Sequence, residues 1–319
     1  MRVTVTGATG LIGPRVVSAL RARGDEVTVL SRDPERARER LERTTATPPS
    51  GERDAVGAEL EAVGWEPSRE RAPSAALSRC EAVVHLAGEN LAQRWSRGAK
   101  QAIRDSRVIG TRHLVEGLAA LEQSERPQVL VAGSAIGYYG PHGDEPIDED
   151  APAGAGFLAQ VCSAWEAEAM VAEQLGLRVV RVRTGVVLDR DGGALAKMIP
   201  PFKLGVGGPV AGGAQYISWI HPRDLVGIVL AAIDDARWHG PVNATAPHPE
   251  RNRDLSTALG HALGRPSLVP VPAVALKLLY GEMSQIVTTG ARVLPARALV
   301  LGYEFRHSEL DSALQAALR

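Results

Sequence analysis

A glycine-rich turn near the start of the chain has the composition of a dinucleotide-binding loop. It comprises Thr6-Gly7-Ala8-Thr9-Gly10-Leu11-Ile12-Gly13, between a short β-branched run and an apolar helical pattern. In such a loop Gly7 permits a tight turn, Gly10 lets backbone approach a pyrophosphate, and Gly13 lets the next helix pack closely on the sheet. The helix N-terminus adds free N–H groups and positive dipole for the phosphates. We expect a dinucleotide here rather than a structural turn that binds nothing, with Thr9, Leu11 and Ile12 completing the contacts.

The end of the second predicted strand bears on the choice between NAD and NADP. In a dinucleotide-binding fold an acidic side chain at this point binds the ribose 2′-hydroxyl of NAD. This chain has Ser31 and Arg32 there, and a hydroxyl beside a guanidinium suits a 2′-phosphate. Asp33 argues against this choice, because it is an acidic side chain one residue later that could bind the ribose of NAD. It could instead cap the helix that begins at Pro34. We therefore expect NADP.

An alternation of strands and helices must position these residues. β-branched runs predict strands at 2–6, 26–30, 82–86, 128–132 and 178–182, with shorter or weaker ones near 60–65 and 242–244; helical patterns occupy 11–22, 34–43, 98–121, 157–175 and 222–236. This alternation is typical of a parallel sheet covered by helices. The expected fold class is α/β: a doubly wound parallel (Rossmann) sheet with a smaller, mostly helical C-terminal substrate lobe.

Proline and glycine mark where the alternation is interrupted. They are frequent over residues 44–73, which we expect to form a long surface excursion, and over 185–217, which we expect to be rich in loops. We assign residues 1–185 and 218–245 to the cofactor-binding domain. Residues 186–217 and 246–319 form the predicted substrate lobe, which would close over the cofactor.

Composition excludes several classes of function. The chain has 319 residues, 36 basic against 37 acidic side chains, and only two cysteines. A net charge of -1 provides no field to attract nucleic acid or an anionic membrane, and no basic face or DNA-recognition motif supports a DNA-binding regulator. Two cysteines cannot form a disulfide framework, and we see neither a signal peptide nor a membrane span. The composition predicts a cytoplasmic globular protein.

Further motifs make the chain resemble an extended, atypical short-chain dehydrogenase/reductase. They are His85-Leu86-Ala87-Gly88-Glu89-Asn90, Gly133-Ser134, Phe157-Leu158-Ala159, Trp165-Glu166-Ala167, Pro201–Pro209 and Trp219-Ile220-His221-Pro222-Arg223-Asp224. They are similar to those of the epimerase-family oxidoreductases, also described as nucleoside-diphosphate-sugar epimerase-like, over essentially the whole chain. The resemblance implies NADP at the carboxyl ends of the strands, with Ser31 and Arg32 at the 2′-phosphate. Leu86, Ala87, Gly88 and Glu89 would line the cofactor, although Glu89-Asn90 could instead form a turn and a helix cap.

The proton-transfer pair usual in that superfamily is missing. Short-chain dehydrogenases generally use a tyrosine four residues before a lysine, together with a serine. None of the five tyrosines is followed by lysine at that spacing; Val161 and Trp165 stand where the pattern would place the pair. Only four lysines occur in the chain, so few candidates could replace the missing one.

Other residues therefore have to carry the chemistry. We predict that Tyr139, or its neighbour Tyr138, exchanges the proton while Ser134 orients the substrate oxygen. The alternative is that both tyrosines only pack the pocket rim. Cys162 is a nucleophile candidate by position alone and more simply a small buried residue.

Four other side chains are weaker candidates. We expect His85 to shape a loop and His221 to order the start of a helix, whereas Arg183 and Lys203 could bind an anionic group or lie on the surface. The eight histidines show no metal-ligand spacing, so no metal is predicted.

The predicted function is hydride transfer at an alcohol or ketone carbon of a small molecule, with a nucleotide sugar as one candidate substrate. The alternative is an NADP-binding sensor or interaction protein without turnover. The expected partners are a small-molecule substrate and, as a candidate, a second copy in a homodimer, with neither nucleic acid nor membrane.

Overall fold

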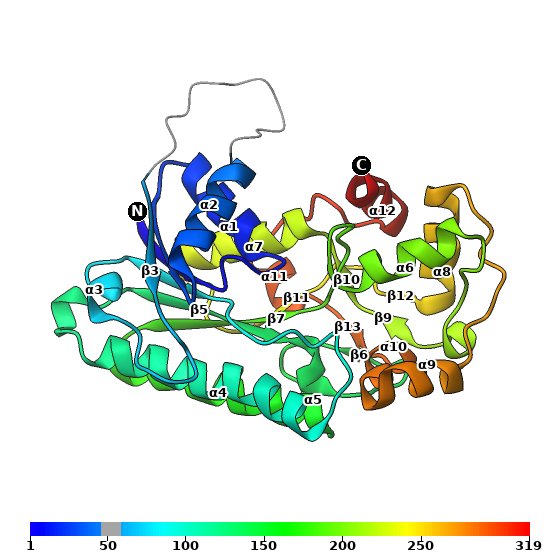
Figure 1. Cartoon of the computed structure of the whole chain (residues 1–319), viewed down its shortest axis with the longest axis horizontal. Coiled ribbons are helices and arrows are strands. Elements are labelled where there is room, and N and C mark those ends of the chain that lie inside the picture. Colours follow the sequence, from blue (N-terminus) through cyan, green and yellow to red (C-terminus); the bar gives the residue numbers. More distant parts are fainter. Residues whose placement is uncertain (46–58) are drawn as a thin grey trace.

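A seven-stranded sheet, all of whose pairings are parallel, runs through the middle of the protein, as the computed structural model shows for residues 1–45 and 59–319 (Figure 1). The strand order is β3-β2-β1-β4-β5-β7-β11. The order reverses between β1 and β4, so this is a doubly wound Rossmann sheet, whose ligands bind outside the carboxyl ends of the strands. The strands are β1 (Arg2–Thr6), β2 (Glu26–Ser31), β3 (Leu60–Gly64), β4 (Ala82–His85), β5 (Val129–Ala135), β7 (Arg178–Thr184) and β11 (Gly240–Ala244).

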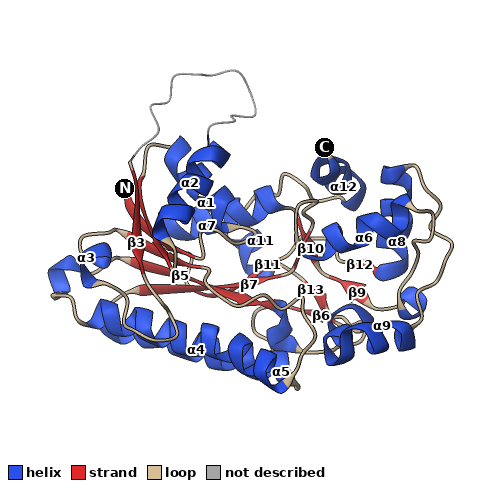
Figure 2. Cartoon of the chain, viewed as in Figure 1, coloured by secondary structure: helices blue, strands red, loops and turns tan. Residues whose placement is uncertain are grey.

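Helices cover both faces of this sheet (Figure 2). One face carries α1 (Gly13–Ala22), α2 (Pro34–Thr45), α7 (Pro222–Asp234) and α11 (Ala296–Val300); the other carries α3 (Ser74–Leu77), α4 (Arg97–Ala119) and α5 (Phe157–Met170). Alternate residues of a strand point to opposite faces. In β7, Val180 and Val182 pack with α7 and Val179 packs towards α4, which is why the strands are apolar on both sides.

The rest of the chain builds a smaller region beyond the carboxyl ends of the strands (Figure 1). Its own apolar core joins α6 (Gly193–Lys203), α8 (Asn252–Leu263) and α12 (Leu310–Leu318). Short strand pairs stitch it together: β8 (Val186–Val187) with β10 (Trp219–Ile220), β9 (Tyr216–Ile217) with β12 (Glu250–Arg251), and β6 (Pro146–Ile147) with β13 (Arg292–Val293).

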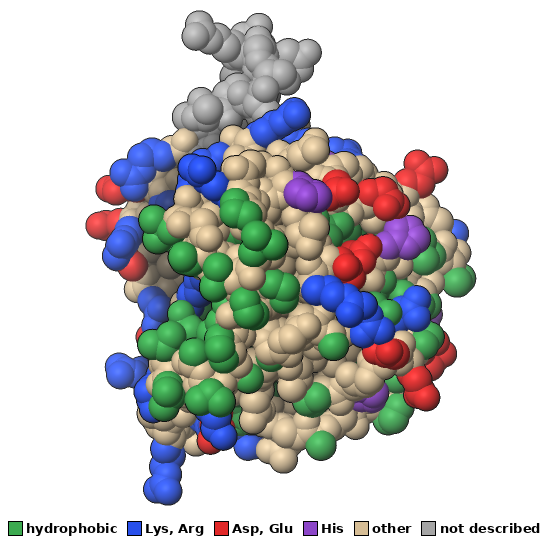
Figure 3. All heavy atoms as spheres, turned by 90° about the vertical axis from the view of Figure 1, so that its right-hand side faces the viewer, with side chains coloured by type: hydrophobic (Ala, Val, Ile, Leu, Met, Phe, Trp, Pro, Cys, Tyr) green, Lys and Arg blue, Asp and Glu red, His purple; other side chains and the backbone are tan. Residues whose placement is uncertain are grey.

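Short helices complete this region and its connections. They are α9 (Ala273–Tyr280), α10 (Gln285–Thr288) and the 3-10 turns η1 (Gln123–Glu125), η2 (Ile136–Tyr139), η3 (Val171–Leu175), η4 (Ala211–Gly213) and η5 (Gly281–Ser284). Helix α9 leaves Val274, Leu278 and Leu279 exposed. Hydrophobic side chains gather on one side of this end of the molecule in Figure 3.

The predicted fold class is confirmed, including the weak strand near residue 60, which is β3. Two details differ. Strand β5 continues to Ala135 instead of ending at residue 132, and α6 forms within the stretch expected to be loops although Pro200 and Pro201 lie inside it. Of the excursion predicted at 44–73, residues 46–58 lie outside the described part of the chain.

The division into two lobes stays a prediction. Ala298 of α11 belongs to the core beneath the main sheet, although its segment was assigned to the substrate lobe. Across residues 1–45 and 59–319, no helix is both long enough and apolar enough to cross a membrane.

Candidate functional site

The turn between β1 and α1 is closed so tightly that two of its positions require glycine. Gly7 has φ +68°, and a Cβ added there would stand 2.5 Å from the carbonyl carbon of Leu86. A Cβ on Gly13 would stand 2.3 Å from the carbonyl oxygen of Gly7. The N–H of Gly10 donates to that same oxygen at 3.0 Å. Residues 7–13 therefore form a turn whose backbone is unobstructed at Gly7 and Gly13, which we call the bare-backbone turn. It lies between the carboxyl ends of β1 and β4, at the point where the strand order reverses.

The first turn of α1 has donors to offer a ligand. Ile12 occupies the N-cap position, its side chain makes no capping hydrogen bond, and no acidic residue lies in the first helical turn. The loop after β8 approaches this turn, since a Cβ on Gly192 would stand 2.5 Å from Cδ1 of Leu11. Uncapped N–H groups and the positive end of the helix dipole suit a phosphate.

A buried hydrogen-bonded chain holds β1 and β4 together beneath the turn. His85 Nδ1 lies 2.7 Å from Thr6 Oγ1, and His85 Nε2 lies 2.9 Å from Thr111 Oγ1. The same Thr6 oxygen accepts from the N–H of Ala87 at 3.3 Å. Burial lowers the pKa of His85 to about 4, so its imidazole is neutral at pH 7. His85 thus orders the loop that follows β4, as expected, and is not arranged to exchange protons.

Ser31, Arg32 and Asp33, at the end of β2 and just after it, have different hydrogen-bond partners. Asp33 Oδ1 accepts from the N–H of Arg36 at 3.1 Å, so its carboxylate caps α2. The Ser31 hydroxyl donates a hydrogen bond to the carbonyl oxygen of Asp33 at 3.1 Å and accepts one from its N–H at 3.2 Å. The Arg32 side chain is exposed and has no hydrogen bond or ion pair within residues 1–45 and 59–319. Asp33 is therefore engaged at the helix, and Arg32 is available to an anion.

The loop after β4 is fixed by an arginine that the motifs did not indicate. Arg107 of α4 donates to the carbonyl oxygen of Glu89 at 3.0 Å, and a Cβ on Gly88 would stand 3.0 Å from its Cζ. Ser106 Oγ accepts from the Glu89 N–H at 2.9 Å. Asn90 Oδ1 accepts from the N–H of Ala92, which is the turn foreseen as the alternative for Glu89-Asn90. Burial lowers the pKa of the Arg107 guanidinium. Nothing in the residue spacing pointed to Arg107.

Three polar residues form one row across neighbouring strands. Ser134 of β5 is the register partner of Arg183 of β7, which is in turn the partner of Asn243 of β11. All three are buried, with exposed fractions of 5%, 2% and 0%. They point to the face covered by α5. The longer β5 creates this row, because it carries Ser134 inside the strand instead of after it.

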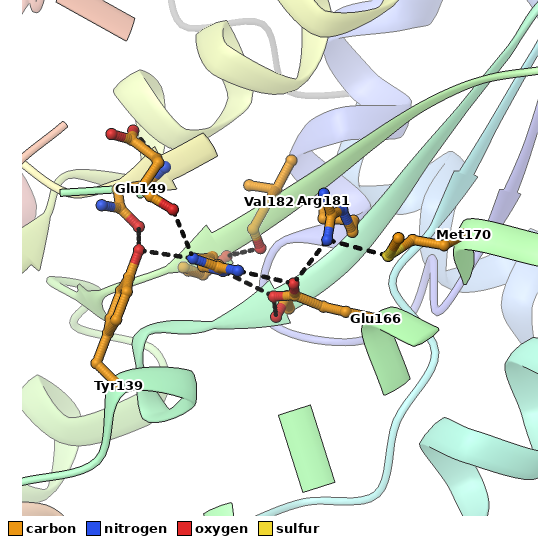
Figure 4. Close-up of polar contacts among 10 residues, drawn as sticks. Tyr139, Glu149, Glu166, Met170, Arg181 and Val182 are labelled. Atoms are coloured by element: carbon orange, nitrogen blue, oxygen red, sulfur yellow. Dashed lines mark hydrogen bonds and ion pairs between the residues drawn. The ribbon is translucent and has the colours of Figure 1, made fainter. Parts of the chain in front are cut away.

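Glu166 of α5 lies over the row and joins its members. Ser134 Oγ donates to Glu166 Oε1 at 2.7 Å. Arg183 binds both carboxylate oxygens, through Nε at 2.8 Å and Nη2 at 2.9 Å. Burial lowers the pKa of Arg183, but its hydrogen bonds and charge pairing with Glu166 outweigh this and raise the pKa overall. Arg181 Nη1 adds a bond to Glu166 Oε2 at 3.2 Å (Figure 4).

Tyr139 and Tyr138 occupy different environments. Tyr139 is completely buried, donates to Asn243 Oδ1 at 2.6 Å and accepts from Arg183 Nη1 at 2.9 Å. Figure 4 shows Tyr139 and Glu166 approaching the same guanidinium from two sides. Burial raises the pKa of Tyr139 to about 12, against the opposing charge of Arg183. Tyr138 is partly exposed, its ring centroid lies 3.5 Å from Arg183 Cζ, and its hydroxyl has no hydrogen-bond partner among the described residues.

The weaker candidates take structural positions. Burial raises the pKa of Cys162 to about 12, helped by the charge of Glu166, so the thiol stays protonated at pH 7. His221 caps α7, and burial together with nearby His307 lowers its pKa to about 3. Arg183, expected at an anionic substrate or on the surface, is instead buried against Glu166. Lys203 is exposed at the end of α6. In the described ranges, no group of three or more His, Cys, Asp or Glu could hold a metal ion.

Comparison with known proteins places this chain in a family. Residues 3–243 match the model of the NAD dependent epimerase/dehydratase family, and residues 271–317 match a domain of unknown function, DUF1731. The Arabidopsis thaliana protein "Epimerase family protein SDR39U1 homolog, chloroplastic" is 39% identical over 319 residues, which cover 100% of this chain and 87% of that protein.

Solved structures agree with the family match. The crystal structure of human epimerase family protein SDR39U1 (isoform 2) with NADPH is 33% identical, covers 100% of both chains and has a TM-score of 0.83. UDP-glucuronic acid 4-epimerase from Bacillus cereus, in complex with UDP-glucuronic acid and NAD, has a TM-score of 0.77 over 99% of this chain and 98% of that one. At 17% identity the second likeness concerns the fold alone.

Proposed function

The chain belongs to the NAD dependent epimerase/dehydratase family, and from that premise we propose that it is an NADP-dependent oxidoreductase or epimerase acting at an alcohol or ketone carbon of a small molecule. The observation that carries this proposal is the bare-backbone turn at Gly7–Gly13. Its geometry leaves no room for a side chain at Gly7 or Gly13, and it opens onto an uncapped helix N-terminus. Such a turn fits a pyrophosphate.

The surroundings of Arg32 support NADP over NAD. Its guanidinium is exposed and unpaired among the described residues, and Asp33 is engaged as the cap of α2. A 2′-phosphate would therefore meet Arg32 without a competing acidic contact, and the Ser31 hydroxyl would turn from the carbonyl oxygen of Asp33 to donate to it. The human relative was crystallised with NADPH, which agrees with this choice.

Ser134 and Tyr138 would act on the substrate. When bound, the nicotinamide supplies or accepts the hydride. The Ser134 hydroxyl donates its single proton to Glu166, so its oxygen is left to accept a hydrogen bond from the hydroxyl of an alcohol substrate, or of the alcohol formed when a ketone is reduced. Tyr138, whose hydroxyl has no partner among the described residues, would give a proton to the substrate oxygen or take one from it.

Tyr139 would serve as a positioning residue. Its hydroxyl is held between Asn243 and Arg183 in a buried site, and the pKa near 12 disfavours loss of its proton. It would thus hold the guanidinium that in turn holds Glu166 and, through it, Ser134. This modifies the expectation that either tyrosine could exchange the proton: within the described part of the chain the Tyr138 hydroxyl has no partner, whereas the Tyr139 hydroxyl has two.

A second candidate is a protein that binds NADP without turnover, as a sensor or interaction module. The observation favouring it is the missing Tyr–Lys pair, for which Val161 and Trp165 stand. No lysine contacts either tyrosine in residues 1–45 and 59–319, so no ammonium is present to ease deprotonation of the phenol.

Turnover decides between the two candidates. Purified protein with NADPH would be incubated with a panel of carbonyl compounds and nucleotide sugars while the nicotinamide absorbance is followed. We expect at least one compound to be reduced, and the rate to fall strongly in Tyr138→Phe. Binding of NADPH without oxidation by any member of the panel would favour the second candidate. The cytoplasmic location stays a prediction, since one relative is described as chloroplastic. The homodimer likewise stays a prediction.

A further inference from the structure

A cavity of about 440 Å³ opens where α4, α5 and η5 meet. Its lining consists of Trp95, Arg97, Lys100, Gln101, Arg104, Phe157 and Glu282. None of these residues belongs to the glycine turn, the Ser31-Arg32 pair, the loop Leu86–Glu89 or the Ser134 row. The cavity is therefore a site separate from those to which the proposed function assigns a ligand.

The cavity has an excess of positive charge. Arg97, Lys100 and Arg104 follow one another at spacings of three and four residues, so they share one face of α4. Lys100 forms an ion pair with Glu282, the one carboxylate in the lining. Gln101 is engaged with Asp105, which accepts at 2.7 and 2.9 Å and lies outside the lining. Arg97 and Arg104 are exposed and have no hydrogen bond or ion pair within the described ranges.

Aromatic rings form another part of the lining. Trp95 and Phe157 pack edge to face with centroids 5.2 Å apart, and Lys100 Nζ lies 5.3 Å from the centroid of Phe157. Trp95 is anchored, because its Nε1 donates to the carbonyl oxygen of Leu91 at 3.0 Å. Phe157 is only partly buried. The cavity thus combines two guanidinium groups that have no partner among the described residues with an apolar surface formed by Trp95 and Phe157.

The position of the cavity is typical of a ligand site. Its lining joins α4 and α5 of the sheet half to Glu282 of the C-terminal segments, and the Lys100–Glu282 ion pair connects the two. Arg94 Nη1 donates to the carbonyl oxygen of Leu278 at 3.3 Å and Lys197 Nζ to that of Ala92 at 3.0 Å, so the chain around Trp95 is held from both sides. Small-molecule sites occur preferentially at such junctions, and the volume lies in the range of known ligand pockets.

We propose that this cavity binds a small organic phosphate, with its phosphoryl group on Arg97 and Arg104 and its apolar part against Phe157. Guanidinium groups match the oxygens of a phosphate with paired N–H donors. A single acid that is already paired with Lys100 does not oppose the anion. The proposal goes beyond the proposed function and does not depend on NADP binding.

Calorimetric titration of the full chain with phenyl phosphate tests this site, with and without saturating NADPH. Because the cavity shares no residue with the turn Gly7–Gly13, the dinucleotide cradle of the proposed function, binding should persist when NADPH occupies that cradle. We expect the Arg97→Ala/Arg104→Ala double variant to bind phenyl phosphate about tenfold more weakly or worse. Inorganic phosphate should bind more weakly than phenyl phosphate, because it does not use Phe157.

Arg69→Ala is the matched control, since Arg69 is also an exposed arginine, lies outside the cavity lining and likewise has no ion pair in the described ranges. It should leave the affinity unchanged. The proposal would be overturned by no binding of phenyl phosphate to the wild type, by equal binding to the double variant, or by an equal loss in Arg69→Ala, which would indicate non-specific attraction. Loss of phenyl phosphate binding only when NADPH is present would also overturn it, because the ligand would then occupy the cradle.

Discussion

Ser134 and Arg183 face each other as register partners on β5 and β7, and a single carboxylate, Glu166, binds both. The serine hydroxyl and the guanidinium each reach it within 2.8 Å. The Ser134 hydroxyl is thus oriented by the carboxylate of a buried ion pair, in a chain that lacks the tyrosine–lysine pair usual in short-chain dehydrogenases. The next two predictions follow from this arrangement.

Removing the Glu166 carboxylate should destabilise the protein strongly. Glu166→Ala leaves Arg183 buried without its partner, and breaking such a pair costs roughly 3–5 kcal/mol. Glu168→Ala is a control on the same helix, because Glu168 pairs with the exposed Arg112 through contacts of 3.2 and 2.5 Å and such surface pairs contribute below about 1 kcal/mol. Urea unfolding of the two variants measures the difference. Equal losses in the free energy of unfolding would show that the buried Glu166–Arg183 pair contributes no more to stability than the surface pair.

Substituting Tyr139 should lower the stability of the protein, whereas substituting Tyr138 should lower its turnover. Tyr139→Phe removes a partner from both Asn243 and Arg183, and we expect a loss of roughly 1–3 kcal/mol. Tyr138→Phe removes a hydroxyl that has no protein partner in the described ranges, so stability should change by less than about 0.5 kcal/mol while turnover falls. Unfolding curves and rates with any substrate found test the pair. A Tyr138→Phe variant with full turnover would rule out proton exchange at Tyr138.

The sequence predicted the parts of the site that depend on neighbouring residues. The glycine turn, Ser31-Arg32 and the loop after β4 are local patterns, and the strands and helices around them form much where expected. The row of Ser134, Arg183 and Asn243 could not be foreseen, because it depends on the order and register of β5, β7 and β11.

The remaining misses have separate physical causes. Glu166 belonged to a motif of the resemblance, but its contact with Ser134 joins residues 32 positions apart. Arg107 gave no signal, since a lone arginine on a long helix is ordinary. Helix α6 was missed because prolines disfavour helix interiors, and packing of Leu195 and Phe202 into the core with α8 compensates for this preference.

Arg32→Ala should discriminate between the two nicotinamide cofactors. If Arg32 contacts the 2′-phosphate, the variant loses about tenfold or more in affinity for NADPH and little for NADH. Arg36→Ala, a change at a nearby exposed position, serves as the control and should alter neither. Fluorescence titration with each cofactor is sufficient. Parallel losses for NADPH and NADH would refute the contact.

Acid should destabilise the protein through His85. Its folded pKa near 4 lies below the ordinary value of 6.5, so the unfolded chain binds a proton that the folded chain does not. This stabilisation is complete above pH 6.5 and declines as the pH falls towards 4. Between pH 7 and pH 5 we expect His85 to contribute a loss of roughly 2 kcal/mol.

Urea unfolding at the two pH values measures this loss. His85→Asn should reduce the dependence, and His142→Gln, a change at an exposed histidine, should preserve it. Should His85→Asn fail to fold, NMR titration of the wild-type imidazole remains decisive. Protonation of His85 near pH 6.5 in the folded protein would contradict the expectation.

Calorimetric titration of NADPH into the wild type, Gly7→Ala and Gly24→Ala tests the dinucleotide cradle most directly. Gly24 also has positive φ, +87°, but a Cβ there meets nothing within 4 Å, so Gly24→Ala reproduces the backbone strain without blocking the turn. The account predicts one NADPH bound per chain by the wild type and by Gly24→Ala, and none by Gly7→Ala. A wild type that binds neither NADPH nor NADH, or a folded Gly7→Ala that binds as tightly as the wild type, would contradict it.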